Sequence, residues 1–420
     1  MEWTEKMSQQ MSRERKGNNI SGKGWTIASL ASIPLVMTLG NSMLIPVLPT
    51  IEKQLQITSF QSSLLITVYS IVAILLIPIA GYFSDRIGRK KVIIPSLFIA
   101  AAGGIISGWA SWKMSEPYGM ILVGRMLQGI GAAGAFPIVL PLVGDLFKKD
   151  SEASSCLGTI ETANTFGKVA SPIVGSVLAG IIWFLLFFAF PLFCAISIVM
   201  MIFFVKSPTK MEQPPPFREF LRNVKAIFYR EGRWLYAVFF IGGAFMFVLF
   251  GELFFLSSML EDDYGIDGLK KGWILAIPLG ALCVASFITG KKIGKNKRLM
   301  KWLIVIGGVI AAATIAFAFM FRQLWWMIAL FFVSGVGIGI VLPCLDALIT
   351  EGIEKKERGT VTSFYSSMRF IGVAAGPPVA ALLMKQATNT MFYGFAGLCV
   401  LSSIITLMAI KPEKEGREIG

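Results

Sequence analysis

The sequence predicts an all-α integral membrane protein in which twelve transmembrane helices form two pseudo-symmetric six-helix halves. Uncharged runs such as 54–84 and 92–112 are long enough to cross a hydrocarbon core of about 30 Å, which takes about 20 apolar residues. Hydrophobic residues make up 55% of the chain and charged residues 15%, whereas a soluble domain has about a quarter charged residues. Motifs also recur about half a chain apart, as expected for a repeated bundle.

The apolar runs divide into twelve expected spans. The first is expected to end at Pro46-Val47-Leu48-Pro49, and a polar tail without a signal-peptide cleavage site precedes it. The stretch 169–205 is uncharged, so a very short turn near Gly180 must divide it. The expected spans are 25–48, 60–83, 91–112, 118–146, 153–180, 183–205, 234–259, 271–290, 300–321, 323–349, 358–384 and 387–410.

The repeat sets the expected domain organisation. Equivalent positions lie 205 or 206 residues apart, which predicts two parallel halves with a substrate site between them near mid-membrane. Matching positions are Gly129, Gly131, Pro137, Asp145, Gly167, Ser171 and Pro172 in the first half and Gly335, Gly337, Pro343, Glu351, Gly372, Gly376 and Pro377 in the second. The expected boundaries are a cytoplasmic tail at 1–23, halves at 24–205 and 234–410, a linker at 206–233 and a tail at 411–420.

The linker has two distinct parts. Three prolines at 214–216 stop any helix, and the basic amphipathic pattern over 217–229 predicts a helix on the inner membrane surface.

The net charge of +14 is unevenly distributed. With both termini in the cytoplasm, 30 of the 39 Lys and Arg residues lie in the tails and loops on that side and six lie on the other. This asymmetry follows the positive-inside rule. The basic residues form no face interleaved with exposed aromatics, so nucleic-acid binding is not expected. We expect a multi-pass plasma-membrane protein, and its compactness and short loops indicate a bacterial source.

The composition argues against catalysis. The chain has no histidine, and Cys156, Cys194, Cys283, Cys344 and Cys399 fall inside spans without metal-ligand spacing. Histidine-based catalysis and histidine metal sites are therefore excluded, and the thiols are expected to be packing residues. No G-x-x-x-x-G-K-[ST] loop indicates a nucleotide motor. We expect no enzyme activity, no cofactor and no metal.

A charged turn between the second and third spans carries the clearest motif. It reads Gly81-Tyr82-Phe83-Ser84-Asp85-Arg86-Ile87-Gly88-Arg89-Lys90-Lys91 and resembles the G-x-x-x-D-R-x-G-R-[RK] signature of the major facilitator superfamily. The resemblance implies the major facilitator fold, secondary transport by rocking of the two halves, and a conformational latch of the outward-facing state. That latch would contain Gly81, Asp85, Arg86, Gly88 and Arg89, with Asp85 paired to Arg89, and Asp145 and Glu351 would form matching latches.

The fourth span contains a buried basic motif. Arg125, Gln128, Gly129 and Gly131 are similar to the Arg-x-x-Gln-Gly-x-Gly signature of facilitator transporters, in which the arginine is assigned to proton coupling in drug exporters. An arginine bonded only to backbone carbonyls is the alternative. The same glycines match a dinucleotide fingerprint, but no strand precedes them, so nucleotide binding is rejected.

The fifth span resembles an antiporter signature, G-x8-G-x3-G-P-x2-G-G. Its residues are Gly158, Gly167, Ser171, Pro172 and Gly175, with serine at two of the glycine positions. Small residues at this spacing let a helix pack tightly across the interface between the halves. The resemblance covers nearly the whole chain and points to the twelve-helix drug/proton antiporters, the multidrug and metabolite exporters.

Six ionisable residues lie inside spans, where each unpaired charge costs roughly 2.5–3.5 kcal/mol on insertion scales. Three are acidic and three basic, so they are expected to face the cavity or one another. They are Arg125, Glu161, Lys168, Glu252, Asp346 and Arg369.

Proton coupling is expected to involve a carboxylate of this set. Glu161, Asn164 and Lys168 share one face of the fifth span, and Glu161 lies at a depth similar to that of Arg125. We expect Glu161 to carry the proton with Arg125 as its partner, and Asp346 and Glu252 are further candidates. The alternative is a permanent structural pair of Glu161 with Arg125 or Lys168.

The cavity wall is expected to combine charge with adaptable apolar side chains. Lys168 stands where the resembled motif usually has a small or apolar residue, which favours a substrate bearing a carboxylate, catecholate or phosphate. The expected lining residues are Asn164, Lys168, Arg369, Phe136, Phe245, Met246 and Phe364.

The expected function is proton-coupled export of small amphipathic organic compounds, drugs or a metabolite, by alternating access. The alternatives are a dedicated exporter of an anionic metabolite such as a siderophore, and a proton-coupled nutrient importer, against which the fifth-span motif argues. A non-transporting receptor or a lipid flippase on the same scaffold is a further class. The expected partners are a small-molecule substrate, protons and membrane lipids, and the chain is expected to act as a monomer.

Overall fold

The computed structural model describes residues 24–147, 150–206, 217–294, 296–318, 320 and 323–411. The expectations for the N-terminal tail, for the prolines at 214–216 and for residues 412–420 lie outside this part of the chain. The described residues form helices and short connections, with no strand among them. Eleven of their helices are long and apolar enough to cross a membrane, and α6 is a further long helix in which Glu161, Asn164 and Lys168 interrupt the apolar pattern.

The long helices fall into two sets of six, which confirms the predicted fold class. The first set is 24–42, α3 (Ser59–Ile87), α4 (Arg89–Lys113), α5 (Tyr118–Leu146), α6 (Asp150–Ile181) and α7 (Leu185–Phe204). The second set is α9 (Arg233–Asp262), α10 (Gly268–Ile293), α11 (Lys297–Ala318), α12 (Leu324–Gly352), α13 (Lys355–Gln386) and α14 (Thr388–Ala409). We call them the N-half and the C-half.

The first span does not stop at its prolines, contrary to the expectation. The 24–42 helix leads into a 3-10 turn, η1 (Ile45–Val47), and then into α2 (Leu48–Leu55). Pro46 and Pro49 stand in the first turn of η1 and α2, where a missing backbone N–H breaks no hydrogen bond. Gln56 ends α2 in the left-handed conformation, at φ 53°.

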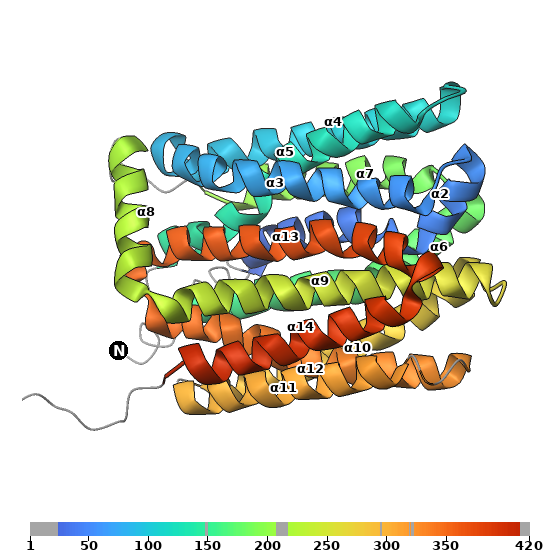
Figure 1. Cartoon of the computed structure of the whole chain (residues 1–420). Coiled ribbons are helices and arrows are strands. Elements are labelled where there is room, and N and C mark those ends of the chain that lie inside the picture. The colour runs from blue at the N-terminus through green and yellow to red at the C-terminus, as the bar shows by residue number, and fades with distance from the viewer. Residues whose placement is uncertain are drawn as a thin grey trace, which may run out of the picture.

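The helices of both halves run roughly parallel, while α8 (Phe217–Glu231) crosses one end of the bundle (Figure 1). The halves meet where α3 packs against α13 and α6 against α10. Phe228 holds α8 in place, since its ring packs edge-on against Phe239 of α9 at 5.4 Å and Phe364 of α13 at 5.8 Å. We call this end of the bundle the α8 end and the opposite one the far end.

The expected short turn near Gly180 is present, because α6 ends at Ile181 and α7 begins at Leu185. The five cysteines are free thiols, and four of them are buried.

Candidate functional site

Four charged side chains gather where the halves face each other. Glu161 and Lys168 come from α6, Asp346 from α12 and Arg369 from α13. The Arg369 guanidinium lies 3.4 Å from an Asp346 carboxylate oxygen, and Lys168 and Glu161 are close enough to act electrostatically on Asp346. Two acids and two bases therefore form a nearly neutral group, which we call the central cluster.

The α6 side of the central cluster is fixed by polar contacts. The Thr38 hydroxyl donates to Asn164 Oδ1 at 2.6 Å, and Asn164 Nδ2 donates to Glu161 at 3.2 Å. Lys168 is 8% exposed, and among the residues that the structure describes none accepts a hydrogen bond from its ammonium. The Cys283 thiol of α10 lies near this ammonium. Lys168 thus presents a cation that is free to bind an anionic group.

Arg125 is placed differently from the expectation. Its Nε donates to the Leu65 carbonyl at 2.8 Å, an Nη donates to Asn41 Oδ1 at 2.7 Å, and another Nη bonds Gln128. Its guanidinium lies 4.5 Å from the centre of the Tyr69 ring. Among the described residues its partners are neutral, so Arg125 fastens helices of the N-half together and is not paired with Glu161.

Glu252 lies apart from the central cluster, inside the C-half. Both of its carboxylate oxygens accept from the Ser334 hydroxyl of α12, at 3.0 and 3.1 Å. Glu252 is 5% exposed, and within the described chain no lysine or arginine pairs with it.

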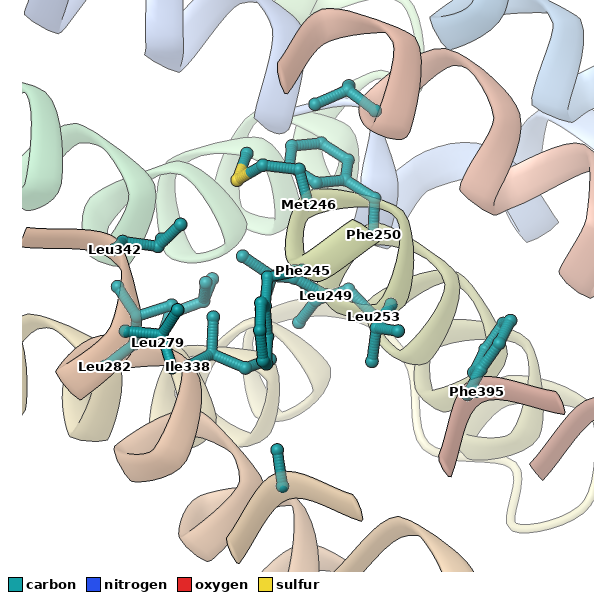
Figure 2. Packing of buried hydrophobic residues seen from close by; sticks show 14 of the residues in the cluster. Phe245, Met246, Leu249, Phe250, Leu253, Leu279, Leu282, Ile338, Leu342 and Phe395 are labelled. Atoms are coloured by element: carbon teal, nitrogen blue, oxygen red, sulfur yellow. The ribbon is translucent and has the colours of Figure 1, made fainter. Parts of the chain in front are cut away.

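The expected apolar cavity residues are spread over several environments. Phe245 and Met246 belong to the C-half core, and Figure 2 shows the Phe245 ring beside Ile338. Phe136 packs against the N-half core, while Phe364 contacts α8 through Phe228.

The charged turn of the sequence motif lies at the α8 end. Arg89 pairs with Asp85 at 2.9 Å and also bonds Asp145, so the three residues form one group within the N-half. Gly88, at φ 111°, occupies a conformation that side chains rarely adopt. Gly81 has open space around it, Arg86 is exposed and Glu351 is half-buried.

A second charge group, which sequence reasoning missed, closes the far end. Lys53 of α2 pairs with Glu261 of α9 at 2.8 Å, and Lys271 of α10 pairs with the same carboxylate at 2.7 Å. Lys53 also lies 3.7 Å from Asp262. This group joins the halves, and we call it the far-end group. Its members stand at the ends of spans, where sequence alone suggests charges hydrated in loops. The signal that could have indicated the group is that Lys53 and Lys271 are expected on the same side of the membrane.

Two further contacts join the halves near these charges. The Ser257 hydroxyl of α9 donates to the Ile45 carbonyl at 2.8 Å, and the Thr67 hydroxyl of α3 donates to the Ala374 carbonyl at 2.6 Å. A hydroxyl-to-backbone bond needs close approach of the two helices, so the halves touch along this interface.

The small residues of α6 let helices approach closely. A Cβ added at Gly175 would lie 2.3 Å from the Met43 carbonyl, and one at Gly272 of α10 would lie 2.7 Å from the Pro172 carbonyl. Gly167 approaches Leu35, Ser171 is fully buried, and Gly158 has open space around it.

Comparisons with known proteins agree with this architecture. The family profile described as Major Facilitator Superfamily matches residues 30–372 and 262–419. The bacillibactin exporter of Bacillus subtilis (strain 168) is 54% identical over 399 residues, covering 93% of this chain and 98% of that one. Multidrug resistance protein 2 of the same organism is 24% identical over 399 residues, covering 92% and 95%.

The fold also matches a solved structure. The human organic anion transporter MFSD10 superposes with a TM-score of 0.72 at 17% identity, covering 91% of this chain and 99% of that one. This likeness concerns the fold alone.

Proposed function

The chain belongs to the Major Facilitator Superfamily, and we propose that it exports an anionic siderophore of the catecholate class in exchange for protons. The Lys168 ammonium carries this proposal, because it faces the other half without a hydrogen-bond acceptor in the described chain and with Arg369 nearby. Catecholate oxygens accept from an ammonium and a guanidinium together, and such charge-assisted bonds are the strong ones. The similarity to a bacillibactin exporter supports the same substrate class.

The substrate would bind across the two halves. Lys168 belongs to the N-half and Arg369 to the C-half. An anion held by both side chains would therefore weaken the ion pair between Arg369 and Asp346. Rearrangement of the central cluster would then accompany each binding event. General multidrug export is the second candidate, supported by the relative at 24% identity.

The orientation that we propose places the α8 end in the cytoplasm. The basic residues concentrate in the loops on that side, in agreement with the positive-inside rule. The far end would then face outward, and its ion pairs would keep the outer side closed while substrate enters from the cytoplasm. We place the protein in the bacterial plasma membrane as a monomer among lipids.

Protons can supply the free energy that this export requires. One proton moving inward through 100 mV releases about 2.3 kcal/mol. A tenfold substrate gradient costs about 1.4 kcal/mol, so one proton per substrate sustains a gradient of more than tenfold, and a pH gradient adds to it. The candidate carriers are Glu161, Asp346 and Glu252, with Arg125 as a residue that orders the N-half, which contains Glu161.

Counterflow in proteoliposomes tests this function. Vesicles preloaded with unlabelled bacillibactin should take up labelled bacillibactin in a saturable way, since exchange needs binding and alternation but no proton gradient. Lys168→Met should raise the half-saturation concentration for bacillibactin. Lys113→Met is the matched control, because the Lys113 ammonium lies over the ring of the neighbouring Trp112.

A second readout uses the native thiol beside Lys168. Bacillibactin should protect Cys283 from a maleimide if it binds at the central cluster. Absence of saturable counterflow in the unaltered protein would contradict the substrate assignment, and counterflow without protection of Cys283 would move the binding site elsewhere.

A further inference from the structure

One buried carboxyl has no charged partner within the described ranges. Glu252 is 5% exposed, and Ser334 donates the hydrogen bond that its side chain accepts. The titratable group that faces it is the Cys399 thiol of α14, and among the described residues no lysine or arginine lies within ion-pair distance. An ionised carboxylate at this depth costs several kcal/mol, and a bound proton removes that cost.

The carboxylates of the central cluster have charged neighbours instead. Asp346 pairs with Arg369, and Lys168 acts on both Asp346 and Glu161. Their negative charges are therefore neutralised by protein cations. An anionic substrate bound to those cations would favour protonation of the same carboxylates, so that substrate and proton would bind together rather than alternate. A proton site for exchange fits better at a distance from the central cluster.

A cavity at the far end is lined in part by α9, the helix that carries Glu252. It has a volume of about 680 Å³ and lies among the ends of α9, α12, α13 and α14. Its inner part is apolar and its rim is polar. We call it the far-end vestibule, with Phe255, Met259, Met327 and Phe392 as its inner wall and Asp263 and Lys385 at its rim.

Helix register connects the vestibule to the carboxyl. On α9, Met259, Phe255 and Glu252 follow at intervals of four and three residues, so they lie on one face. Glu252 is about 4.5 Å below Phe255 along the axis, since each residue rises 1.5 Å. On α12, which runs in the opposite direction, the same sequence of vestibule, aromatic ring and polar residue is Met327, Phe331 and Ser334.

Three aromatic rings pack together at the inner wall of the vestibule, on the Glu252 side. Phe255 packs edge-on against Phe392 at 5.1 Å, and Phe331 stacks on Phe392 at 6.3 Å. All three side chains are less than 10% exposed. We call this group the aromatic plug. Aromatic side chains occupy discrete rotamers, so the plug would open for water when one of its rings rotates to another rotamer.

We propose that the exchanged proton binds Glu252, and that it arrives from the far end through the vestibule and past the aromatic plug. This inference rests on the proposed proton-coupled export. A hydronium ion in the vestibule gives up its proton and becomes water as an O–H bond forms on the Glu252 carboxylate, and that O–H bond later breaks when water on the α8 side accepts the proton. The path lies within the C-half and is separate from the substrate route between the halves.

The far-end group provides the coupling between the two routes. Glu252 and Glu261 are nine residues apart on α9, or about 13.5 Å along the helix. Separation of Lys53 from Glu261 during opening removes a cation from the far end of α9, the helix that also carries the Glu252 carboxyl. Opening at the far end thereby changes the environment of the bound proton.

Separating exchange from proton-driven transport tests the proposal. Glu252→Gln cannot bind and release a proton, so accumulation of bacillibactin against its gradient under an imposed pH gradient should be lost while counterflow continues. Asp346→Asn and Glu161→Gln should keep a response to the pH gradient. Loss of that response in Asp346→Asn or Glu161→Gln together with its retention in Glu252→Gln would overturn the proposal.

A measurement without substrate tests the path itself. A water-soluble carbodiimide reacts with protonated carboxyls, and peptide mass spectrometry locates the product. Modification of Glu252 should be slow in the native protein and faster in Phe392→Ala. The milder Phe392→Leu should show the same direction of change, and it keeps the test valid if Phe392→Ala folds poorly. Phe317→Ala removes a ring exposed on the outside of α11 and is the matched control.

The two experiments distinguish the possible failures. No counterflow in the unaltered protein contradicts the proposed substrate, and the carbodiimide result still decides whether the vestibule leads to Glu252. Equal modification rates in Phe392→Ala, Phe392→Leu and Phe317→Ala, or a rate that rises only when Lys53 is removed, would overturn the path through the aromatic plug.

Discussion

Among the described residues, charged side chains join the two halves at the far end, whereas those that pair at the α8 end do so within one half or, as Arg230 and Glu357 do, between α8 and α13. Lys53 and Glu261 belong to different halves, while Asp85, Arg89 and Asp145 all belong to the N-half. The difference indicates which end the structure holds shut. Ion pairs thus connect the two halves at the far end and stabilise the N-half internally at the α8 end.

Burial divides the far-end group into a buried ion pair and an exposed one. The side chains of Lys271 and Glu261 are 1% and 8% exposed, but that of Lys53 is 58% exposed. Lys271 and Glu261 both belong to the C-half, so their pair can persist when the halves separate. We infer that Lys271 keeps the Glu261 carboxylate in place, while the ion pair of Lys53 with Glu261 forms and breaks as the halves close and open.

The largest expected effect follows from removing the shared carboxylate. Glu261→Gln leaves the buried Lys271 ammonium unpaired, and losing one partner of a buried pair costs about 3–5 kcal/mol of the free energy of unfolding. Thermal unfolding in detergent measures this loss. The double variant Glu261→Gln with Lys271→Met should regain most of the stability without restoring closure; equal stability of the single and double variants would contradict this role for Lys271.

The next effect tests the close approach of the halves. Gly272→Ala places a methyl group 2.7 Å from the Pro172 carbonyl of the other half, so the helices must separate, at a cost of about 1–3 kcal/mol. Labelling of a Ser257→Cys reporter by an impermeant maleimide, with Cys283 replaced by serine, should increase. Gly280→Ala on the same helix meets open space and should not increase it.

A smaller effect is expected from the exposed partner. Lys53→Ala removes the lysine that crosses the interface, and exposed ion pairs contribute about 0–1 kcal/mol. A change of 1 kcal/mol shifts a two-state equilibrium about fivefold, so labelling of Ser257→Cys should rise by up to that factor. Lys113→Ala is the control, and equal labelling in the two variants would show that Lys53 does not hold the halves together.

The smallest expected effect is at the α8 end. Asp145→Asn removes a half-exposed carboxylate that bonds Arg89 within the N-half, at a cost of about 0–1 kcal/mol. Because no bond between halves is lost, labelling of Ser257→Cys should stay unchanged. A clear increase in that labelling would erase the proposed difference between the two ends.

Much of the fold can be predicted from the lengths of the apolar runs. The expected turn near Gly180 and the helix of the linker are both present, since uncharged stretches and amphipathic spacing leave few alternatives. The end of the first span was wrong because a proline at the start of a helical turn permits a new turn as readily as it stops an old one.

The candidate site was less predictable. Sequence gives the depth of a residue along a helix but not the direction of its side chain in the bundle. Arg125 and Glu161 are at similar depths, yet Arg125 bonds neutral groups such as Leu65 and Asn41. The pair of Lys53 and Glu261 joins residues 208 positions apart, and no local pattern specifies it.

The central claim is that the far end opens when the protein works. It can be tested by measuring spin-label distances across both ends of the reconstituted protein, with labels at Gln56 and Lys270 for the far end and at Arg86 and Glu354 for the α8 end. Bacillibactin with an imposed pH gradient should lengthen the far-end distance and shorten the α8-end distance. Distances that stay fixed at both ends while transport proceeds would contradict the account.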